Sequence, residues 1–575
     1  MRDEKANVTF GHEDRATRAK PAPRRHGRRT VQGALLAAAL VVSVSANGGS
    51  SATASDLASP QSESTAAASG VSTPITLTAK VDGSNTRITG DNQGFSVESA
   101  DFAHGFLTKE RLSERLKTLG PHGVIRIGGY SMDLVWPALG DYRDAPAPPE
   151  AIGGTVDQSD FDNLKELLDD SGWQVTLGAP LKAIIDPAMV TSPLKDPSPK
   201  VTLDQVVAEV KAASDTLGDD LLSVELGNEY DLVTKLTGVQ YYDTAKQYQT
   251  AINAAIPHAK LKMTVPSANT AKTNTKLDEF VTAVQADRTT NPQQVISELA
   301  SHWYPGSHCG TSTSTVAALM SDTTHTTTRT KLTGIMDIAA RLHDTIPSVI
   351  NESNSASCSG MPGVSNAYAS SLWSLDYLMQ TAQSGVSRVQ FHTNTYGICG
   401  DFKARASVDY PISYRYYGAF CADNQAALDA GELSASPLYY GLWAFRQVPQ
   451  GRFVNLNLAD SDLSNLRAYG VKSPNGDLTM ILINVQDPTS NASTNDAVTL
   501  NLPTSYGEGR SVTLQSSAAA GLSSTDASAI TLGGRTVAPS GVASGAPQAV
   551  AVDVQHSSST VTVAPGTAQI VTFSN

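Results

Sequence analysis

Short apolar or β-branched runs recur eight times between residues 94 and 392, and most of them precede a stretch with helical periodicity. Such alternation is typical of parallel β/α units. The expected strands are 95–98, 124–129, 174–177, 222–226, 261–265, 299–304, 348–350 and 386–391. Because eight parallel strands can close a barrel, the pattern predicts an α/β fold with a (β/α)8 TIM barrel over residues 91–435.

From about residue 435 onward, short strand-like runs are separated by Gly, Pro, Asn and Ser. Helical periodicity is nearly absent there, which favours an antiparallel β-sandwich over residues 436–575. The run 75–81, ahead of the barrel, also alternates like a strand. We therefore expect segment 73–90 to join the sandwich and tie the two ends of the folded chain together.

The first residues have the pattern of an export signal. A basic stretch over residues 24–29 precedes the apolar run 34–42, and small residues lead to a cleavage point after Ala46. The apolar run is too short to cross a bilayer stably. We expect residues 1–46 to be a signal peptide, read by the Sec or the twin-arginine route, and the protein to be secreted. Residues 47–72, dense in Ser, Ala, Thr and Gly, predict a disordered linker.

The charge balance limits the partners. The whole chain carries a formal charge of −13, and residues 1–46 hold nine Lys and Arg against four Asp and Glu, so the remainder carries −18. A surface of that sign repels nucleic acid and highly sulfated glycans. The balance disfavours a heparin-degrading enzyme and is compatible with a local basic groove.

Four cysteines fall in the later part of the predicted barrel, and no CxxC pair exists, so a zinc site has little support. In an exported protein we expect two disulfides. Of the three possible pairings we favour Cys309 with Cys358 and Cys399 with Cys421, because each would join loops on one rim. Free buried thiols are the alternative.

Two glutamates stand at the ends of matching apolar runs: Glu229 in 224–229 and Glu352 in 349–355. They follow the fourth and seventh expected strands, whose ends face each other across a barrel mouth, where such barrels place catalytic groups. Retaining glycoside hydrolysis requires two such carboxylates. The alternative for a lone glutamate after an apolar run is a non-catalytic residue on the surface or at a helix N-terminus.

The two glutamates can be given separate roles. Glu229 is expected to be the acid/base and Glu352 the nucleophile, while Asn228 can bond the 2-hydroxyl of the sugar. An inverting enzyme would hold the carboxyl groups farther apart. Glu225 lies on the same strand face as Glu229 and is expected to sit deeper in the barrel, with a cationic partner such as Arg126.

Five motifs together resemble glycoside hydrolase family 79, which includes β-glucuronidases and heparanases, over roughly residues 75–575. These motifs are 94–98, 125–129, 227–229, 302–305 and 351–355. The resemblance implies a barrel with a β-sandwich and a retaining enzyme that removes β-linked glucuronic acid, with or without a 4-O-methyl group, from glucuronides or glycans.

The resemblance also implies roles for further residues. Glu98 would bind sugar hydroxyls, the phenol of Tyr304 would bond the nucleophile, and His302 would form a pocket wall. The alternatives are a structural ion pair for Glu98 and a core aromatic for Tyr304. The implied donors to the glucuronate carboxylate are Ser359, Gly360 and Tyr396.

One of these loops departs from the heparanase pattern, which has consecutive glycines where this chain has Cys358-Ser359-Gly360. This difference and the acidic charge favour a microbial, exo-acting type. No metal or organic cofactor is expected. The expected partner is a carbohydrate or glucuronide substrate, with no nucleic acid, and no oligomeric state is indicated. The competing interpretations are a barrel glycosidase acting on a neutral β-sugar and an inactive carbohydrate-binding relative.

Overall fold

A computed structural model describes most of the chain after residue 74. The described residues are 75–80, 84–190, 199–257, 262–264, 268–269, 274–288, 296–342, 346–400, 415–457 and 465–575. The expected signal peptide and linker, residues 1–46 and 47–72, lie outside the described residues and stay predictions.

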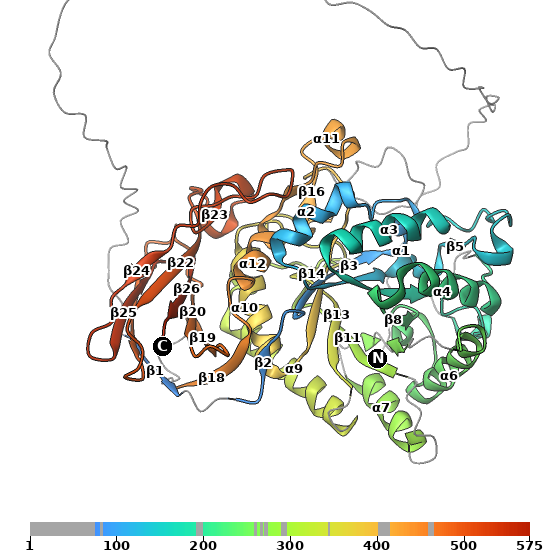
Figure 1. Cartoon of the computed structure of the whole chain (residues 1–575), viewed down its shortest axis with the longest axis horizontal. Helices are drawn as coiled ribbons and strands as arrows, with labels where there is room; N and C mark the ends of the chain where they lie inside the picture. The colour runs from blue at the N-terminus through green and yellow to red at the C-terminus, as the bar shows by residue number, and fades with distance from the viewer. Residues whose placement is uncertain are drawn as a thin grey trace, which may run out of the picture. The chain divides into compact units, whose positions relative to one another are not determined.

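Eight parallel strands form a closed ring in chain order (Figure 1). They are β3 (Gln93–Glu98), β4 (Val124–Gly128), β7 (Gln174–Ala179), β8 (Leu221–Leu226), β9 (Met263–Thr264), β11 (Ile296–Trp303), β13 (Ser348–Ser353) and β15 (Arg388–His392). The pairing of β15 with β3 closes the ring. The predicted barrel is confirmed, although the bounds of several strands differ from those expected. The seventh strand extends to Ser353, so Glu352 lies inside it and not after it.

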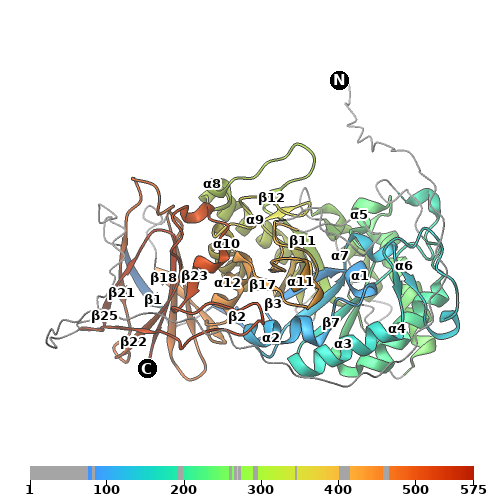
Figure 2. The same cartoon turned by 90° about the horizontal axis from the view of Figure 1, so that it is seen from above.

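Helices cover the outside of the barrel (Figure 2). They include α2 (Lys109–Leu119), α3 (Gln158–Ser171), α4 (Leu203–Leu217), α6 (Gly238–Ala255), α7 (Thr275–Arg288), α9 (Asp322–Ala339) and α10 (Ala369–Ser384). Capping boxes start three of them, because an N-cap side chain and the side chain three residues on satisfy the free N–H groups of the first turn. These pairs are Asp157 with Asp160, Thr202 with Gln205, and Thr237 with Gln240.

The second part is a β-sandwich whose strands come mainly from the last third of the chain. Its longer strands are β1 (Ile75–Lys80), β18 (Gly451–Asn457), β19 (Leu466–Lys472), β20 (Leu478–Asn484), β21 (Asp496–Asn501), β22 (Gly509–Ser516), β25 (Ser558–Val563) and β26 (Thr567–Phe573). The prediction that an N-terminal strand joins it is confirmed, because β1 pairs with β18 and β21. The β1–β21 pair is parallel, unlike the antiparallel pairs around it.

Strand β20 is buried on both faces. Met480 and Leu482 pack into the core of the sandwich, whereas Ile481 and Ile483 belong to the large core that includes the barrel helices. Helix α10 is buried along almost its whole length, and the Tyr469 hydroxyl of β19 bonds its Asp376 at 2.5 Å. One face of this sheet therefore packs into the same apolar core as the barrel helices, and the other face packs into a separate core of the sandwich.

Helix α12 (Pro437–Phe445) lies in the stretch that we expected to be entirely sandwich. All nine of its residues are buried, and it packs against α10. Because the helix is apolar on every side, its sequence lacks the alternation of apolar and polar residues that identifies an amphipathic helix. The boundary between residues 435 and 436 stays a proposal. None of the described helices is long and apolar enough to cross a membrane.

Both predicted disulfides are present: Cys309–Cys358 and Cys399–Cys421. The first joins the loops after β11 and β13 across a separation of 49 residues. Replacing both of its cysteines by Ser should lower the free energy of unfolding by about 4 kcal/mol. The reason is that a bridge closing a loop of this length reduces the conformational entropy of the unfolded chain, and the variant regains that entropy. Urea unfolding of the oxidised variant and wild type measures this, and a change below about 1 kcal/mol would contradict it.

Candidate active site

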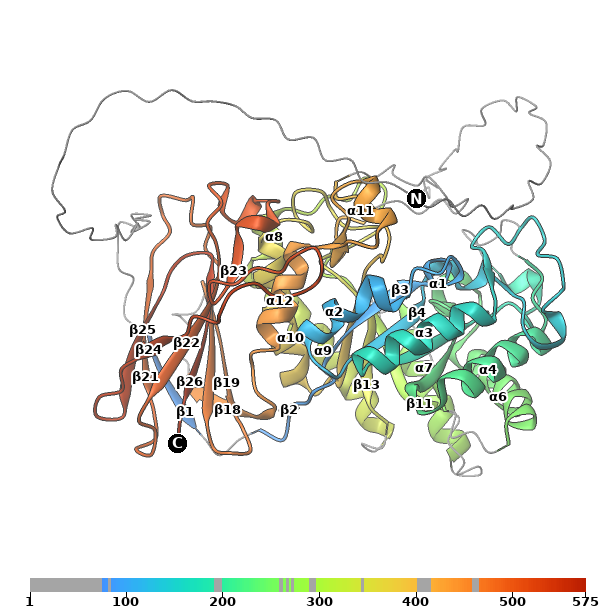
Figure 3. The same ribbon diagram turned by 45° about the horizontal axis from the view of Figure 1, so that its top comes forward.

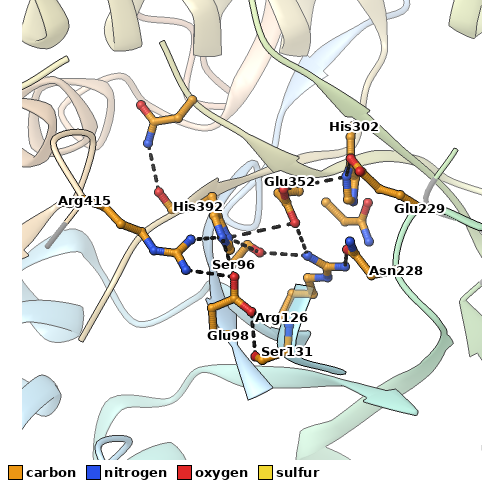
Figure 4. Close-up of polar contacts among 12 residues, drawn as sticks. Ser96, Glu98, Arg126, Ser131, Asn228, Glu229, His302, Glu352, His392 and Arg415 are labelled. Carbon is orange, nitrogen blue, oxygen red and sulfur yellow. Dashed lines mark hydrogen bonds and ion pairs between the residues drawn. The ribbon is translucent and has the colours of Figure 1, made fainter. Parts of the chain in front are cut away.

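Polar side chains gather at the carboxyl ends of the barrel strands (Figure 4). Glu352 of β13 and His302 of β11 occupy paired positions on neighbouring strands. Glu98 ends β3, Glu229 follows β8 and His392 ends β15. Strands distant in sequence thus bring their terminal residues to one place, as parallel barrels do.

Glu352 has donors on both carboxylate oxygens. Arg126 Nη1 donates to Oε2 at 2.6 Å, and the Tyr304 hydroxyl donates to Oε1 at 2.9 Å. Burial alone would raise the pKa of Glu352, but the positive charges of His302, His392 and Arg126 and the Tyr304 hydrogen bond hold it well below its usual range. Glu352 is therefore ionised at neutral pH, as a nucleophile must be.

Glu229 is positioned by a sharp backbone turn after β8. Gly227 and Glu229 have φ values of +68° and +46°. A side chain at position 227 would strike Leu181, because an added Cβ lies 2.4 Å from the Leu181 Cβ. The turn aims the Glu229 carboxylate at His302, whose Nδ1 lies 2.7 Å from Oε1.

His302 links the two glutamates. Its Nδ1 is 3.8 Å from Glu352 Oε1 as well as 2.7 Å from Glu229. Burial lowers the pKa of His302, but the two carboxylates outweigh burial and raise it. Ligand atoms of the three residues lie within 4.8 Å of one another.

Arg126 is the cationic partner that we expected for Glu225. It is fully buried and donates to both Glu225 oxygens, at 2.7 and 2.9 Å. Its Nη2 also donates to Asn228 Oδ1 at 2.8 Å, which leaves the Asn228 amide N–H groups as the end that can donate to a ligand. One guanidinium thus connects the deep Glu225 with the two residues expected to contact the sugar, Asn228 and Glu352.

Glu98 is held by protein groups. Arg415 Nη2 donates to Oε1 at 2.8 Å, and the backbone N–H and hydroxyl of Ser131 donate to Oε2 at 2.8 and 2.6 Å. Burial raises the pKa of Glu98, but Arg415, His392 and Ser131 lower it to about 2. This is the ion pair that we gave as the alternative, and sugar binding by Glu98 stays a prediction.

The acid stability of the protein should depend on Glu98. A carboxyl whose pKa is lowered to about 2 in the fold contributes stability in full above its ordinary value of 4.5 and loses it as the pH falls toward 2. We expect Glu98→Gln to remove up to about 3 kcal/mol of this pH dependence. Melting curves between pH 4.5 and pH 2 measure it, and the exposed Glu508→Gln is the matched control. Parallel curves for wild type and Glu98→Gln would contradict the expectation.

The sequence did not lead us to several members of this network, among them Ser131, His392, Arg415 and Tyr417. His392 Nδ1 lies 3.0 Å from Ser96 Oγ, and its Nε2 is contacted by Arg415. Arg415 also donates to the Tyr417 hydroxyl at 3.2 Å. His392 directly follows the predicted strand 386–391, a position that could have identified it, whereas Arg415 and Tyr417 belong to no strand or helix.

Ser359, Gly360 and Tyr396 occupy loops beyond β13 and β15. Among the described residues, none of the three bonds to either glutamate. The carbonyls of Ser359 and Gly360 accept from Tyr416 N and His308 Nδ1, both at 2.8 Å, and the Tyr396 ring stacks on Phe106 at 4.4 Å. Their role as carboxylate donors stays a prediction.

The loop that departs from the heparanase pattern keeps a glycine-like backbone. Cys358, Ser359 and Gly360 have φ values of +57°, +69° and +78°. Two consecutive non-glycine residues in this region are strained, and such strain is often found at functional sites. The disulfide at Cys358 and the His308 contact help to hold the strained turn.

Glu229, His302 and Glu352 have the spacing of metal ligands. However, Glu352 faces the buried guanidinium of Arg126 at 2.6 Å, a fixed cation that would repel a metal ion. Glu229 and His302 already bond each other. The donor set therefore fits proton transfer and nucleophilic attack better than metal binding.

The fold is that of glycosidases that combine a barrel with a β-sandwich. One similar solved structure is a 4-O-α-L-rhamnosyl-β-D-glucuronidase from Fusarium oxysporum 12S, with 20% identity, a TM-score of 0.62, and 86% of this chain and 100% of that one covered. An arabinofuranosidase of family GH51 from Xanthomonas axonopodis pv. citri (13%, 0.55, 87% and 100%) and a Paenibacillus polymyxa xyloglucanase of family 44 (11%, 0.53, 87% and 100%) are similar too. No protein-family model matches the chain, and no curated protein matches it by sequence. At these identities the similarity establishes the fold, and it leaves membership of family 79 as a proposal.

Proposed function

We propose that this protein is a retaining glycoside hydrolase that removes β-linked glucuronic acid from glucuronides or glycans. The observation that carries the proposal is the pair Glu229 and Glu352, which extend from opposite sides of a barrel mouth with carboxylate oxygens within 4.8 Å. Retaining enzymes hold their carboxyl groups about 5 to 5.5 Å apart, whereas inverting enzymes hold them roughly 6.5 to 9.5 Å apart to admit a water. The short separation supports attack by the enzyme itself.

In the first step, Glu352 attacks the anomeric carbon while Glu229 gives its proton to the departing oxygen, so a glycosyl-enzyme ester forms and the aglycone leaves. His302 orients the Glu229 carboxyl. Arg126 and Tyr304 hold the attacking carboxylate in place. Asn228, with its oxygen fixed by Arg126, can donate to the 2-hydroxyl, a contact that strengthens in the transition state.

In the second step, Glu229 takes a proton from water, and the resulting hydroxide attacks the anomeric carbon and displaces Glu352. The same residue thus works as acid and then as base, and two inversions retain the β configuration. The two carboxylates complete this chemistry with water as the only co-reactant.

Glucuronic acid is proposed as the sugar on three grounds. The five motifs resemble family 79, and a structurally similar protein is described as a glucuronidase. The Tyr396 hydroxyl is buried and bonds to no group in the described part of the chain, so it could donate to a ligand carboxylate.

The two disulfides fit an exported enzyme, and we propose that it acts outside the cell.

Hydrolysis of p-nitrophenyl β-glucuronide beside the β-glucoside and β-xyloside tests the proposal. We expect glucuronide-selective cleavage by wild type and a fall of about 10²- to 10⁴-fold in kcat/KM for Glu229→Gln, the range for loss of a general acid/base. Preference for a neutral sugar would favour the second candidate, a neutral-sugar glycosidase like several proteins of similar fold. No cleavage of any of the three would reject the exo-glucuronidase.

Tyr304→Phe should lower kcat/KM about 10- to 100-fold, because a hydrogen bond to a charged group contributes about 1.5 to 3 kcal/mol. The lost donor also stabilises the ionised form of Glu352, so the pKa of Glu352 should rise. The acidic limb of the kcat/KM profile is then expected to shift to higher pH. An unchanged acidic limb would show that Tyr304 has only a packing role. Tyr417→Phe is a neighbouring control, because the two ring centroids lie 6.3 Å apart.

A further inference from the structure

Three cations stand in a row across neighbouring strands, at the end of the sandwich sheet that lies near the start of the barrel. In the strand register, Arg452 of β18 is opposite Arg87 of β2 (Arg87–Ile88) on one side and Lys472 of β19 on the other. Figure 3 shows β2 beside β18. The three cations lie on one face of the sheet, opposite to Ile88 and Phe453. Ile88 and Phe453 are buried, whereas Arg87 and Arg452 are exposed and Lys472 is half-buried.

The row lines a groove of about 400 Å³. The groove also presents the amide of Gln450 and the hydroxyls of Thr89 and Ser473, and none of the described residues that line it is acidic. This is contrary to the chain as a whole, in which 55 Asp and Glu outnumber 42 Lys and Arg. None of the three cations forms an ion pair with another described residue.

Like charges directly opposite one another on neighbouring strands destabilise a sheet. Three in succession, without acidic partners in the described chain, remain costly until an anion neutralises them. The groove is open and presents cations beside amide and hydroxyl groups. Such a surface can bind a polymeric ligand that carries both carboxylates and hydroxyls.

We propose that this groove binds an acidic polysaccharide through its uronate carboxylates. The choice of uronate as the anion rests on the proposed function. The groove is distinct from the candidate active site: β2 ends at Ile88, just before β3 begins at Gln93, whereas Glu98 lies at the other end of β3. Six residues of strand separate the two ends by roughly 20 Å. A polymer held there would keep its ends at high effective concentration near the barrel mouth.

Affinity electrophoresis of the full chain in gels containing polygalacturonate tests this inference, with a neutral β-glucan and double-stranded DNA as comparison ligands. We expect wild type to bind polygalacturonate at low salt, and Arg87→Gln/Arg452→Gln/Lys472→Gln to bind at least about tenfold more weakly, a loss of about 1.4 kcal/mol. The matched control is Arg143→Gln/Lys211→Gln/Arg510→Gln, which removes the same charge from exposed positions elsewhere. If the groove variant does not fold, Arg452→Gln alone removes the central cation.

Equal affinity of the groove and control variants would overturn the inference, as would no binding by wild type. Binding of DNA as tight as that of polygalacturonate would also overturn it, because the groove would then be a general polyanion site. Hydrolysis of p-nitrophenyl β-glucuronide should be unchanged in the groove variant. If the protein binds polygalacturonate through the groove but hydrolyses no glucuronide, the proposed function is rejected and the inference about the groove is retained.

Discussion

Glu352→Gln is expected to lower kcat/KM for p-nitrophenyl β-glucuronide on the order of 10⁴-fold or more, the largest loss of activity from any single change in this protein. Glutamine keeps the shape of the side chain, but its one amide oxygen can accept from only one of the two donors, Arg126 and Tyr304, and its amide does not form the glycosyl ester. Steady-state hydrolysis over a wide range of enzyme concentration measures the loss. Retention of more than about a tenth of wild-type activity would exclude Glu352 as the nucleophile.

The direction of attack can be tested with azide. In Glu352→Ala, azide can enter the vacated space and attack from the face that Glu352 occupied, which gives an α-glycosyl azide. In Glu229→Ala, azide can instead attack the glycosyl-enzyme from the opposite face, which gives the β product. Proton NMR of the anomeric centre distinguishes them, and the reverse assignment of products would exchange the roles proposed for the two glutamates.

Arg126→Met is expected to cause the largest loss of stability. The fully buried guanidinium compensates Glu225 and Glu352, and removing one partner of a buried ion pair typically costs about 3 to 5 kcal/mol because a charge is left unpaired. The free energy of unfolding in urea measures this. The same change at exposed Arg510 should cost less than about 0.5 kcal/mol.

Arg126→Lys separates charge from geometry. Lysine restores a positive charge but cannot donate along the two parallel directions that Arg126 uses toward Glu225. We expect it to recover part of the stability and little of the activity, since Asn228 and Glu352 lose their common donor. Full activity in Arg126→Lys would contradict a positioning role for the guanidinium.

The features that the sequence predicted well are those with a local signature. Each barrel strand is a short apolar run, and Glu229 and Glu352 each stand beside one, so both could be located from their neighbours. The partner of Glu225 could be inferred because a buried carboxylate needs a cation. The disulfide pairing followed from the expectation that each bridge joins loops on one rim.

Other features depend on contacts that no local pattern records. Arg415 donates to Glu98, which is 317 residues away in the sequence, and it lies outside any strand or helix. No neighbouring residue in the sequence therefore indicates this contact. Helix α12 lacks a polar face because the barrel and the sandwich both cover it. The charge row of Arg87, Arg452 and Lys472 appears only when the strand register is known.

The position of β1 also constrains how the molecule can be made. Its partners, β18 and β21, follow more than 350 residues later, so β1 remains an unpaired edge while the whole barrel is synthesised. Contacts between such distant segments are slow to form, and exposed strand edges favour aggregation. A cell that exports this chain unfolded would avoid the time during which β1 is folded beside no partner strand. In a host that accumulates the chain inside the cell, much of it should be found as insoluble protein.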